Sequence, residues 1–376
     1  MSETVKIIHT ADLHLGAEMS YLGSAADERR AELLLTFEKI IDLCNNKNAD
    51  LLLIAGDLFE NNSVGSKYIS RVLQMIESLK NTTVVFAAGN HDPLTSDSPF
   101  LNSDLPDNLI VLDTHDQRVP IKNLPVTIYG KSFGSCYMES DDDFSINADT
   151  DNINIMVMHA DISGTAGGYN CISSDYIANS NMDYIALGHI HKYSKISVLG
   201  KTKFAYCGCP EPHGFDELGD KGVIYAEISK NNFNAQFINT CRRRHIECKV
   251  DISGIDTVGA ISEKILSELK EKYGENFADN LYKIILCGEI SDGVTVDIPE
   301  IKKRISDTVF YAKIKDKTRP FYDLTALSRE NSLKGKFVKL MLEKAANADA
   351  EQKDIIQNAL DLGLKAFETE VKYYED

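Results

Sequence analysis

The sequence lacks an apolar run long enough to cross a bilayer, and no basic segment followed by an apolar core precedes its first strand-like stretch. We therefore expect a protein with no membrane span and no secretory signal. The eight cysteines are scattered, and several fall inside apolar helical or strand patterns. In a chain of 376 residues without a signal, this usage predicts reduced thiols and a cytoplasmic location.

Basic residues are also few. The chain has 40 Lys and Arg against 57 Asp and Glu, which gives a formal net charge of −17. Affinity for nucleic acid depends heavily on neutralising phosphates with Lys and Arg, so this balance argues against a chain that grips DNA tightly alone. The objection is weaker for an enzyme whose site holds divalent cations, or whose grip on DNA comes from a partner.

Strand and helix patterns alternate in the first half of the chain. The all-apolar run at residues 51–55 suits a strand buried on both faces, and residues 33–44 and 69–79 repeat apolar side chains at helical spacing. Such alternation implies parallel crossovers. Because the chain becomes strand-rich beyond residue 109, we predict an α/β protein with a four-layered α/β/β/α sandwich. Its strands are expected at residues 5–9, 51–55, 83–88, 109–112, 126–129, 153–158, 184–187, 202–206, 223–228 and 233–238.

The length of 376 residues allows more than one domain. We predict the sandwich at residues 1–241, a small α+β domain at 242–322 that begins with three arginines, and a C-terminal helical region at 323–376. Residues 139–151, rich in Asp, Ser and Asn, predict a solvated loop. The later elements are expected as strands at 246–252, 282–287 and 310–314, and as helices at 256–272, 298–305, 332–344 and 349–373.

Five short strings of Asp, His and Asn follow predicted strands in order along the chain. The carboxyl ends of neighbouring strands in an open α/β sheet converge on one crevice, so side chains placed there are expected to meet. Asp-x-His or Gly-Asp alone arises readily by chance, whereas the ordered combination is specific. The strings are Asp12-Leu13-His14, Gly56-Asp57, Gly89-Asn90-His91-Asp92, His159-Ala160-Asp161 and Gly188-His189-Ile190-His191.

The chemistry of these side chains indicates a pair of metal ions. Asp, Asn and His without Cys suit Mn²⁺, Fe²⁺ or Zn²⁺ better than Ca²⁺. Two ions about 3.5–4 Å apart activate a water and hold the phosphoryl oxygens of an in-line displacement. His91 is then spare beside the scissile phosphate, where it can stabilise charge or protonate the leaving oxygen. The predicted ligands are Asp12, His14, Asp57 and His191 for one ion, and Asp57, Asn90, His159 and His189 for the other, with Asp57 bridging.

Other conspicuous residues have structural interpretations. A single His that begins a loop is more often a hydrogen-bonded structural residue than a ligand, and only the joint pattern reverses this expectation. We expect structural roles for His9 and His115, while a structural and a substrate-facing role are evenly balanced for His213. Cys207 and Cys209 lack the two-residue spacer of redox and zinc motifs, so buried thiols are expected.

The strings resemble the motifs of the calcineurin-like metallophosphoesterases and, within them, of the Mre11/SbcD-type DNA repair exonucleases. The resemblance rests on residues 9–16, 55–59, 89–93 and 187–191 and extends more faintly into the second domain. There, residues 312–337 resemble the shorter bacterial branch called YhaO-like.

The resemblance implies a Mn²⁺-dependent 3′→5′ exonuclease and endonuclease that acts on DNA in end processing and repair, with a capping domain over the cleft. It also implies a Rad50/SbcC-like ATPase partner that contacts helices after the cap, and a homodimer formed through helices of the N-terminal half. The chain departs from several relatives at Glu60, where they place a His or Asp, and this difference bears on how DNA is positioned.

Two other functions fit parts of the pattern. A phosphoesterase for a small-molecule phosphodiester would use the same metals but would not need the extra C-terminal domain and helices. A non-catalytic scaffold for an ATPase is disfavoured, because His91 and all the proposed ligand positions hold competent residues. A phosphoprotein phosphatase is disfavoured as well, since Glu60, Asn61 and Asn62 stand where that branch is expected to carry Asp-Arg-Gly.

Overall fold

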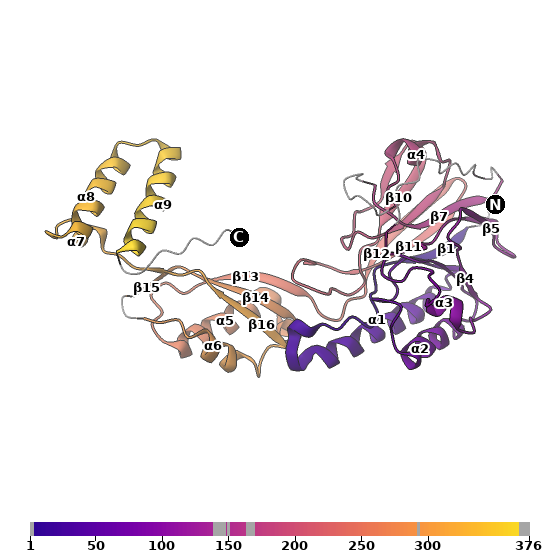
Figure 1. The fold of residues 1–376 in the computed structure, drawn as a ribbon, viewed down its shortest axis with the longest axis horizontal. Coiled ribbons are helices and arrows are strands. Elements are labelled where there is room, and N and C mark those ends of the chain that lie inside the picture. The colour runs from indigo at the N-terminus through magenta and orange to yellow at the C-terminus, as the bar shows by residue number, and fades with distance from the viewer. Residues whose placement is uncertain (1–3, 138–147, 149–150, 163–169, 292–293, 368–376) are drawn as a thin grey trace. The chain divides into compact units, whose positions relative to one another are not determined.

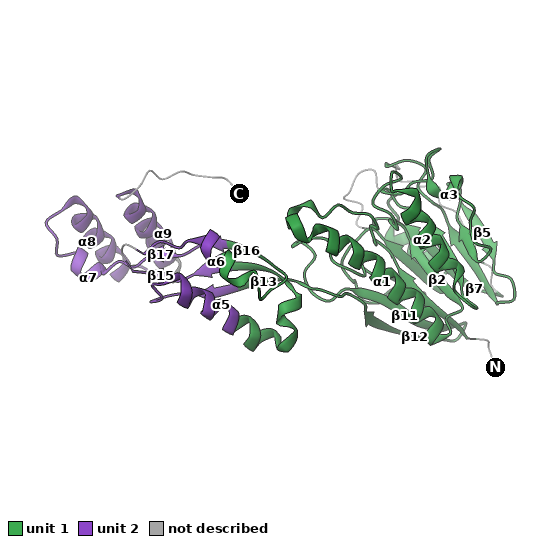
Figure 2. Ribbon diagram, turned by 90° about the horizontal axis from the view of Figure 1, so that it is seen from below, with its two compact units in different colours: residues 1–248, 268–284, 302–314 green, residues 249–267, 285–301, 315–376 purple. Residues whose placement is uncertain are grey.

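The computed structural model describes residues 4–137, 148, 151–162, 170–291 and 294–367. The chain divides into two compact units (Figure 2). The first comprises residues 1–248, 268–284 and 302–314, and the second comprises residues 249–267, 285–301 and 315–376. The domain boundaries predicted after residues 241 and 322 stay predictions.

The first six-stranded sheet contains the earliest strands of the chain. Its order is β12-β11-β1-β2-β3-β4, in which β1 to β4 are parallel neighbours and β11 runs antiparallel to both β1 and β12. Every residue of β2 is buried, as its all-apolar sequence predicts. The strands are β1 (Val5–Thr10), β2 (Leu51–Ala55), β3 (Thr83–Ala87), β4 (Leu109–Val111), β11 (Gly222–Ser229) and β12 (Asn232–Asn239).

The second six-stranded sheet has the order β5-β6-β7-β8-β10-β9. Its four central strands are parallel, and an antiparallel strand closes each edge. The two edge strands are short and carry little apolar pattern, which is why the sequence did not predict them. The strands are β5 (Gln117–Pro120), β6 (Val126–Gly130), β7 (Ile153–His159), β8 (Tyr184–Gly188), β9 (Ser197–Leu199) and β10 (Thr202–Tyr206).

The alternation of side chains along each strand produces the layers. Ile54 of β2 points to a core shared with α1 (Ala26–Lys47) and α2 (Ser66–Glu77), whereas its neighbour Leu53 points to the core between the two sheets. The outer face of the second sheet packs on α4 (Ser174–Asn179). Figure 1 shows α1 and α2 on one side of the paired sheets and α4 on the other. The predicted four-layered sandwich is therefore confirmed.

The remaining strands form two small sheets. One has the order β13-β14-β16, and the other pairs β15 with β17. The helices predicted beside the first of these are α5 and α6, while the short helical segments η1, α3 and α7 were not predicted. These elements are η1 (Ser20–Ala25), α3 (Pro99–Asn102), β13 (His245–Asp251), α5 (Val258–Tyr273), η2 (Glu275–Asp279), β14 (Leu281–Cys287), β15 (Glu289–Ile290), α6 (Ile298–Ile305), β16 (Tyr311–Asp316), β17 (Arg319–Pro320) and α7 (Leu324–Leu327).

The last two helices of the described part of the chain are α8 (Leu333–Ala346) and α9 (Ala350–Ala366). They belong to the second unit and share a small core that includes Val338 and Leu360. The helix predicted to extend to residue 373 ends at Ala366, and residues 368–376 lie outside the described part of the chain. Most of the loop predicted at residues 139–151 lies outside it as well.

Candidate metal centre

The five strings lie at the carboxyl ends of parallel strands of both sheets and on the loops that follow them. The loops follow β1, β2 and β3 in the first sheet and β7 and β8 in the second. The backbone N–H of Asp12 donates to the carbonyl of Gly56, and that of His14 to the carbonyl of Asp57, both at 3.0 Å. From the other sheet, the N–H of His189 donates to Asp12 Oδ1 at 2.9 Å. These bonds bring residues that are distant in sequence to one place.

Several candidate ligands occupy left-handed backbone. The angle φ is 53° at Asp12, 45° at His14, 51° at Asp57 and 99° at His189. Residues other than glycine in sparsely populated regions of this kind cost about 1–3 kcal/mol each and cluster at functional sites. The loops therefore accept backbone strain in order to aim these four side chains inward.

Glycine is required at two points where backbone meets a candidate ligand. A Cβ on Gly89 would lie 2.1 Å from Asp57 Oδ1, and one on Gly56 would lie 2.3 Å from His159 Nδ1. Both distances are far below van der Waals contact, so a larger residue would displace the ligand. The glycines that precede Asp57 and Asn90 are thus part of the site's construction.

Asp92, the last residue of its string, holds the loop after β2. Its carboxylate is fully buried and accepts four backbone N–H groups, those of Gly89, Asp57, Leu58 and Phe59, at 2.7–3.2 Å. One side chain therefore satisfies four buried donors and fixes the backbone that carries Asp57.

Around Asp57, hydrogen-bond acceptors face one another. His159 donates from Nδ1 to the carbonyl of Ala55 at 3.0 Å, so its Nε2 carries a lone pair when the ring is neutral. That nitrogen lies 3.0 Å from Asn90 Oδ1 and 3.4 Å from Asp57 Oδ2. An imidazole lone pair, an amide oxygen and a carboxylate repel one another, and a shared cation removes the repulsion.

The same pattern occurs on the other side of Asp57. His14 Nδ1 donates to Glu60 at 2.8 Å, and His191 Nδ1 donates to Glu217. The two Nε2 atoms therefore face each other, 3.3 Å apart, and His14 Nε2 lies 3.6 Å from Asp57 Oδ2. Only a proton or a metal ion between such atoms makes the arrangement favourable.

A buried oxygen of Asp12 completes the donor set. Its Oδ2 has no hydrogen-bond partner among the described residues, although the side chain is fully buried. An ionised carboxylate oxygen in this position is costly unless a cation satisfies it. The Asp, Asn and His donors therefore fit divalent metal ions, with Asp57 Oδ2 near Nε2 of both His14 and His159.

Burial sets the protonation of three of the histidines. It lowers the pKa of His159 to about 4, and it also lowers the pKa values of His14 and His189. Neutral imidazole is the form that binds metal, so these rings are ready to act as ligands at neutral pH.

The carboxylates and the fourth histidine differ. Burial raises the pKa of Asp12 to about 7. Burial also opposes ionisation of Asp57, but His159 and His14 outweigh it and hold the pKa of Asp57 below its ordinary value. For His191 burial favours the neutral ring, yet the bond to Glu217 and the charge of Asp12 prevail and raise its pKa to about 9. Without a metal ion, both nitrogens of the His191 ring thus carry a proton at neutral pH. A metal ion must displace the proton on Nε2.

An open cavity borders this cluster and contains His91. Its lining includes His14, Glu60, His91, His191 and His213. The backbone N–H of His91 donates to Asp57 Oδ1 at 3.0 Å, and its ring Nδ1 donates to the carbonyl of Glu60 at 3.1 Å. The ring is thereby anchored beside Asp57, with 41% of the side chain exposed.

The structure brings together all seven predicted ligands and His91. His213 lies with them, its ring centroid 5.1 Å from that of His14. His9 is buried and hydrogen-bonded to Tyr184 at 2.8 Å, and His115 is exposed, so neither belongs to the cluster. Cys207 and Cys209 are buried free thiols, as expected.

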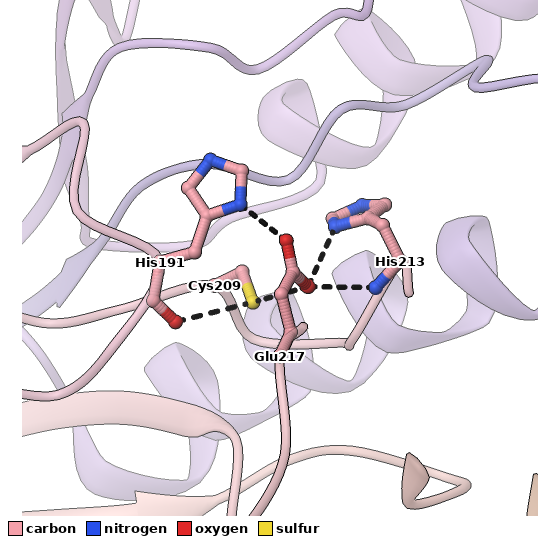
Figure 3. Close-up of side chains that lie close together, drawn as sticks. All are labelled: His191, Cys209, His213 and Glu217. Carbon is pink, nitrogen blue, oxygen red and sulfur yellow. Dashed lines mark hydrogen bonds and ion pairs between the residues drawn. The ribbon is translucent and has the colours of Figure 1, made fainter. Parts of the chain in front are cut away.

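Sequence reasoning missed Glu217. Figure 3 shows its carboxylate between His191, His213 and Cys209. It lies on the loop between β10 and β11, away from any strand end that carries a motif. Nothing in the local pattern distinguishes it from other acidic residues, and only the fold reveals its position.

The chain belongs to the calcineurin-like phosphoesterase family, whose model matches residues 5–193. It is thus a metallophosphoesterase, a hydrolase of a family that uses divalent metal ions. Among the residues that the structure describes, no helix combines the length and apolar character needed to cross a bilayer.

Curated relatives extend the match beyond the family model. The uncharacterized metallophosphoesterase YhaO of Bacillus subtilis is 25% identical over 288 residues, covering 72% of this chain and 70% of YhaO. The DNA double-strand break repair protein Mre11 of Aeropyrum pernix is 24% identical, covering 66% of this chain and 64% of that protein. Its namesake in Sulfolobus acidocaldarius is also 24% identical, covering 71% of each chain.

Proposed function

We propose that this protein is a metal-dependent DNA nuclease, a 3′→5′ exonuclease and endonuclease that hydrolyses phosphodiester bonds in DNA end processing and repair. The observation that carries the proposal is the convergence of acceptor atoms on Asp57, whose Oδ2 faces Nε2 of both His14 and His159. Two of the relatives described above are DNA double-strand break repair proteins, which supports DNA as the substrate.

The candidate ligands divide into two sets that share Asp57. Asp12, His14, Asp57 and His191 would hold one ion, and Asp57, Asn90, His159 and His189 the other. When bound, such a pair polarises the phosphoryl oxygens and supplies an activated water. We propose Mn²⁺ as the metal, because carboxylate, amide and imidazole donors without thiolate suit it; Fe²⁺ and Zn²⁺ satisfy the same donors.

His91 is the proposed catalytic residue. Because its Nδ1 proton is committed to the carbonyl of Glu60, only Nε2 is available to the cavity. A protonated Nε2 can donate to the leaving oxygen or stabilise charge that develops on the phosphate. The hydrogen bond from the His91 backbone to Asp57 keeps the ring next to the proposed bridging ligand.

A partner is proposed to supply the grip on DNA that this acidic chain lacks. With a net charge of −17, the protein lacks the excess of basic residues that tight DNA binding requires. We propose that a Rad50/SbcC-like ATPase supplies this grip and docks on α8 and α9. Those helices leave Leu340 51% exposed and Ile355 64% exposed after packing on each other. A homodimer of this chain stays a prediction.

The docking proposal is tested by co-expression with an ATPase of this type and affinity capture. Leu340→Glu and Ile355→Glu should abolish co-purification without changing cleavage of a small diester by the isolated chain. Val198→Glu, at a 58% exposed position on β9, is the matched control and should be captured normally. Equal capture of all four proteins would overturn the docking site.

The nuclease proposal is tested with purified protein and end-labelled DNA. Single strands, linear duplexes and hairpins are incubated with Mn²⁺, Mg²⁺ or Zn²⁺, alone and with the ATPase partner, and an EDTA-treated sample serves as control. The expected result is Mn²⁺-dependent shortening of labelled strands from the 3′ end. If every DNA stays intact while bis-p-nitrophenyl phosphate is hydrolysed, the nuclease proposal fails and the metal centre survives.

One observation favours a second candidate, a small-molecule phosphodiester. The described residues that line the cavity include two carboxylates, Glu18 and Glu60, and none of them is a Lys or Arg. Such a lining suits a substrate with one phosphate better than a polyanion. Hydrolysis of a cyclic nucleotide with kcat/KM at least tenfold above that for a dinucleotide or DNA would favour this candidate.

A further inference from the structure

The side chain of Glu217 is a buried carboxylate that accepts several hydrogen bonds. It belongs to the loop between β10 and β11 and is only 9% exposed. Its Oε2 accepts the backbone N–H of His213 at 2.7 Å and the thiol of Cys209 at 3.2 Å, and Nδ1 of His213 lies 3.3 Å away. Its Oε1 accepts Nδ1–H of His191 (Figure 3). The carboxylate is therefore held from several directions before any metal ion binds.

This arrangement fixes which nitrogen of His191 can bind metal. Because Nδ1 keeps its proton to donate to Glu217, the lone pair of the metal-binding form must be on Nε2. Nε2 is the atom that faces His14 at 3.3 Å. The same loop also holds the His191 backbone, since Lys221 Nζ donates to its carbonyl at 2.6 Å.

The loop between β10 and β11 also contacts His14, the histidine that faces His191. Nε2 of His213 donates to the carbonyl of Leu13 at 3.2 Å, and its ring packs edge-on against His14. Glu217, which accepts the backbone N–H of His213, is thus connected to the segments that carry His14 and His191. His159 and Asn90, two candidate ligands of the other ion, are held by different groups: His159 Nδ1 donates to the carbonyl of Ala55 at 3.0 Å, and its Nε2 lies 3.0 Å from Asn90 Oδ1.

A metal ion held by Glu217 itself is the competing interpretation. His191, Cys209, His213 and Glu217 place one donor atom each within 4.8 Å of one another. An ion there would take Nδ1 of His191 and remove the proton that Glu217 accepts. The Glu217 carboxylate already accepts hydrogen bonds from the His191 ring, the Cys209 thiol and the backbone N–H of His213, so the geometry favours the hydrogen-bonded form.

We propose that Glu217 is a positioning residue for the metal ion bound by Asp12, His14, Asp57 and His191, and that it acts by holding His191 with Nε2 toward that ion. The proposal rests on the metal centre of the proposed function. Carboxylates that orient a ligating histidine typically contribute 10–100-fold to metal affinity. The effect is expected at one of the two ions only, because Glu217 bonds to His191, which belongs to the ligand set of that ion.

The test compares the wild-type protein with Glu217→Gln and with Asp216→Asn, a matched change at the exposed neighbour. Both metal sites are titrated with Mn²⁺ against a competing chromophoric chelator. In Glu217→Gln one affinity should fall by about 10–100-fold and the other should stay within about threefold of wild type. Asp216→Asn should match wild type at both sites.

A second measurement needs no variant at position 217. Imidazole ¹⁵N shifts of the Zn²⁺-loaded wild-type protein, with the His191 signals assigned from His191→Gln, report which ring nitrogen is protonated. The proposal requires protonated Nδ1 and metal-bound Nε2 at His191. It therefore remains open to refutation even if Glu217→Gln does not fold.

The outcomes distinguish a failure of the positioning role of Glu217 from a failure of the proposed metal centre. Wild-type protein that binds no Mn²⁺ would remove the metal centre and, with it, the role of Glu217. Two wild-type ions with unchanged affinities in Glu217→Gln would overturn the positioning role alone. An equal loss at both sites would indicate a merely structural role, and a third ion per chain lost in Glu217→Gln would establish the competing interpretation; either result also overturns the proposal.

Discussion

The carboxylate of Asp92 accepts the backbone N–H of Leu58 at 2.7 Å, so a buried side chain on one loop fixes the backbone of another. The same carboxylate also receives the N–H groups of Gly89, Asp57 and Phe59. Asp92 is not placed to bind metal. Asp92 instead holds the backbone of the site in its folded shape. Its substitution therefore measures how much these hydrogen bonds contribute to the free energy of unfolding.

Asp92→Ala should destabilise the metal-free protein severely. The change leaves four buried N–H groups without their acceptor, and unsatisfied groups cost about 1–3 kcal/mol each, so a loss of about 3–5 kcal/mol is expected after partial relaxation. Urea unfolding in the presence of EDTA measures it. Asp107→Asn, at an exposed position, should unfold like wild type; a loss below about 1 kcal/mol in Asp92→Ala would contradict the four-bond account.

Asp57→Ala should remove both metal ions rather than one. Asp57 Oδ2 lies 3.6 Å from His14 Nε2 and 3.4 Å from His159 Nε2, between the two candidate ligand sets. Metal analysis after Mn²⁺ loading and gel filtration should find two ions per wild-type chain and none in the variant. If two ions remain on Asp57→Ala, Asp57 does not bridge.

His91→Ala should abolish cleavage while sparing the metal ions. The ring contacts Glu60 through its backbone carbonyl and is absent from both ligand sets, so its loss should lower kcat by about 10²–10⁴-fold, the usual range for a general acid or base. Turnover is measured with DNA and with bis-p-nitrophenyl phosphate, and metal content in parallel. His115→Ala, at an exposed position, is the control, and turnover of His91→Ala equal to that control would remove His91 from the mechanism.

His9 should make the metal-free protein less stable in acid. Burial lowers the pKa of His9 from 6.5 to about 3. Above pH 6.5 the ring is neutral in the folded and unfolded states alike, and its titration adds nothing. Below 6.5 the unfolded chain takes up the proton first, so stability falls as the pH falls toward 3.

The size of this effect follows from linkage. At about pH 5.5 His9 alone should cost about 1.4 kcal/mol relative to pH 7.5. Urea unfolding at both values should show a smaller pH-dependent loss in His9→Gln by this amount, whereas His115→Gln should keep the wild-type dependence. An identical pH dependence in wild type and His9→Gln would show that His9 does not titrate as described.

Much of the fold could be predicted because its central strands are strongly patterned. The run at residues 51–55 is apolar throughout, and it forms β2 with every residue buried. The edge strands β5 and β9 could not be predicted, because segments of only four and three residues become strands only when a neighbouring strand offers hydrogen bonds. Helix α4, six residues long, is likewise too short to show a helical period.

The site divides in the same way. The positions of the candidate ligands were predictable because their residue types follow buried strands in order, and the topology of parallel strands brings such positions together. The contacts that orient them were not. Glu60 was recognised as a departure from relatives, but its bond to His14 required the fold, and Glu217 carries no local signal at all.

The loops that hold the candidate ligands come from both sheets, three from one and two from the other. Each metal ion that draws donors from both is therefore a non-covalent cross-link between the halves of the sandwich. Binding to the folded state alone, at a concentration 100 times the dissociation constant, adds about 2.7 kcal/mol per ion. The lifetime of the folded protein in a cell should accordingly follow the supply of divalent metal ions, independently of any demand for its catalysis.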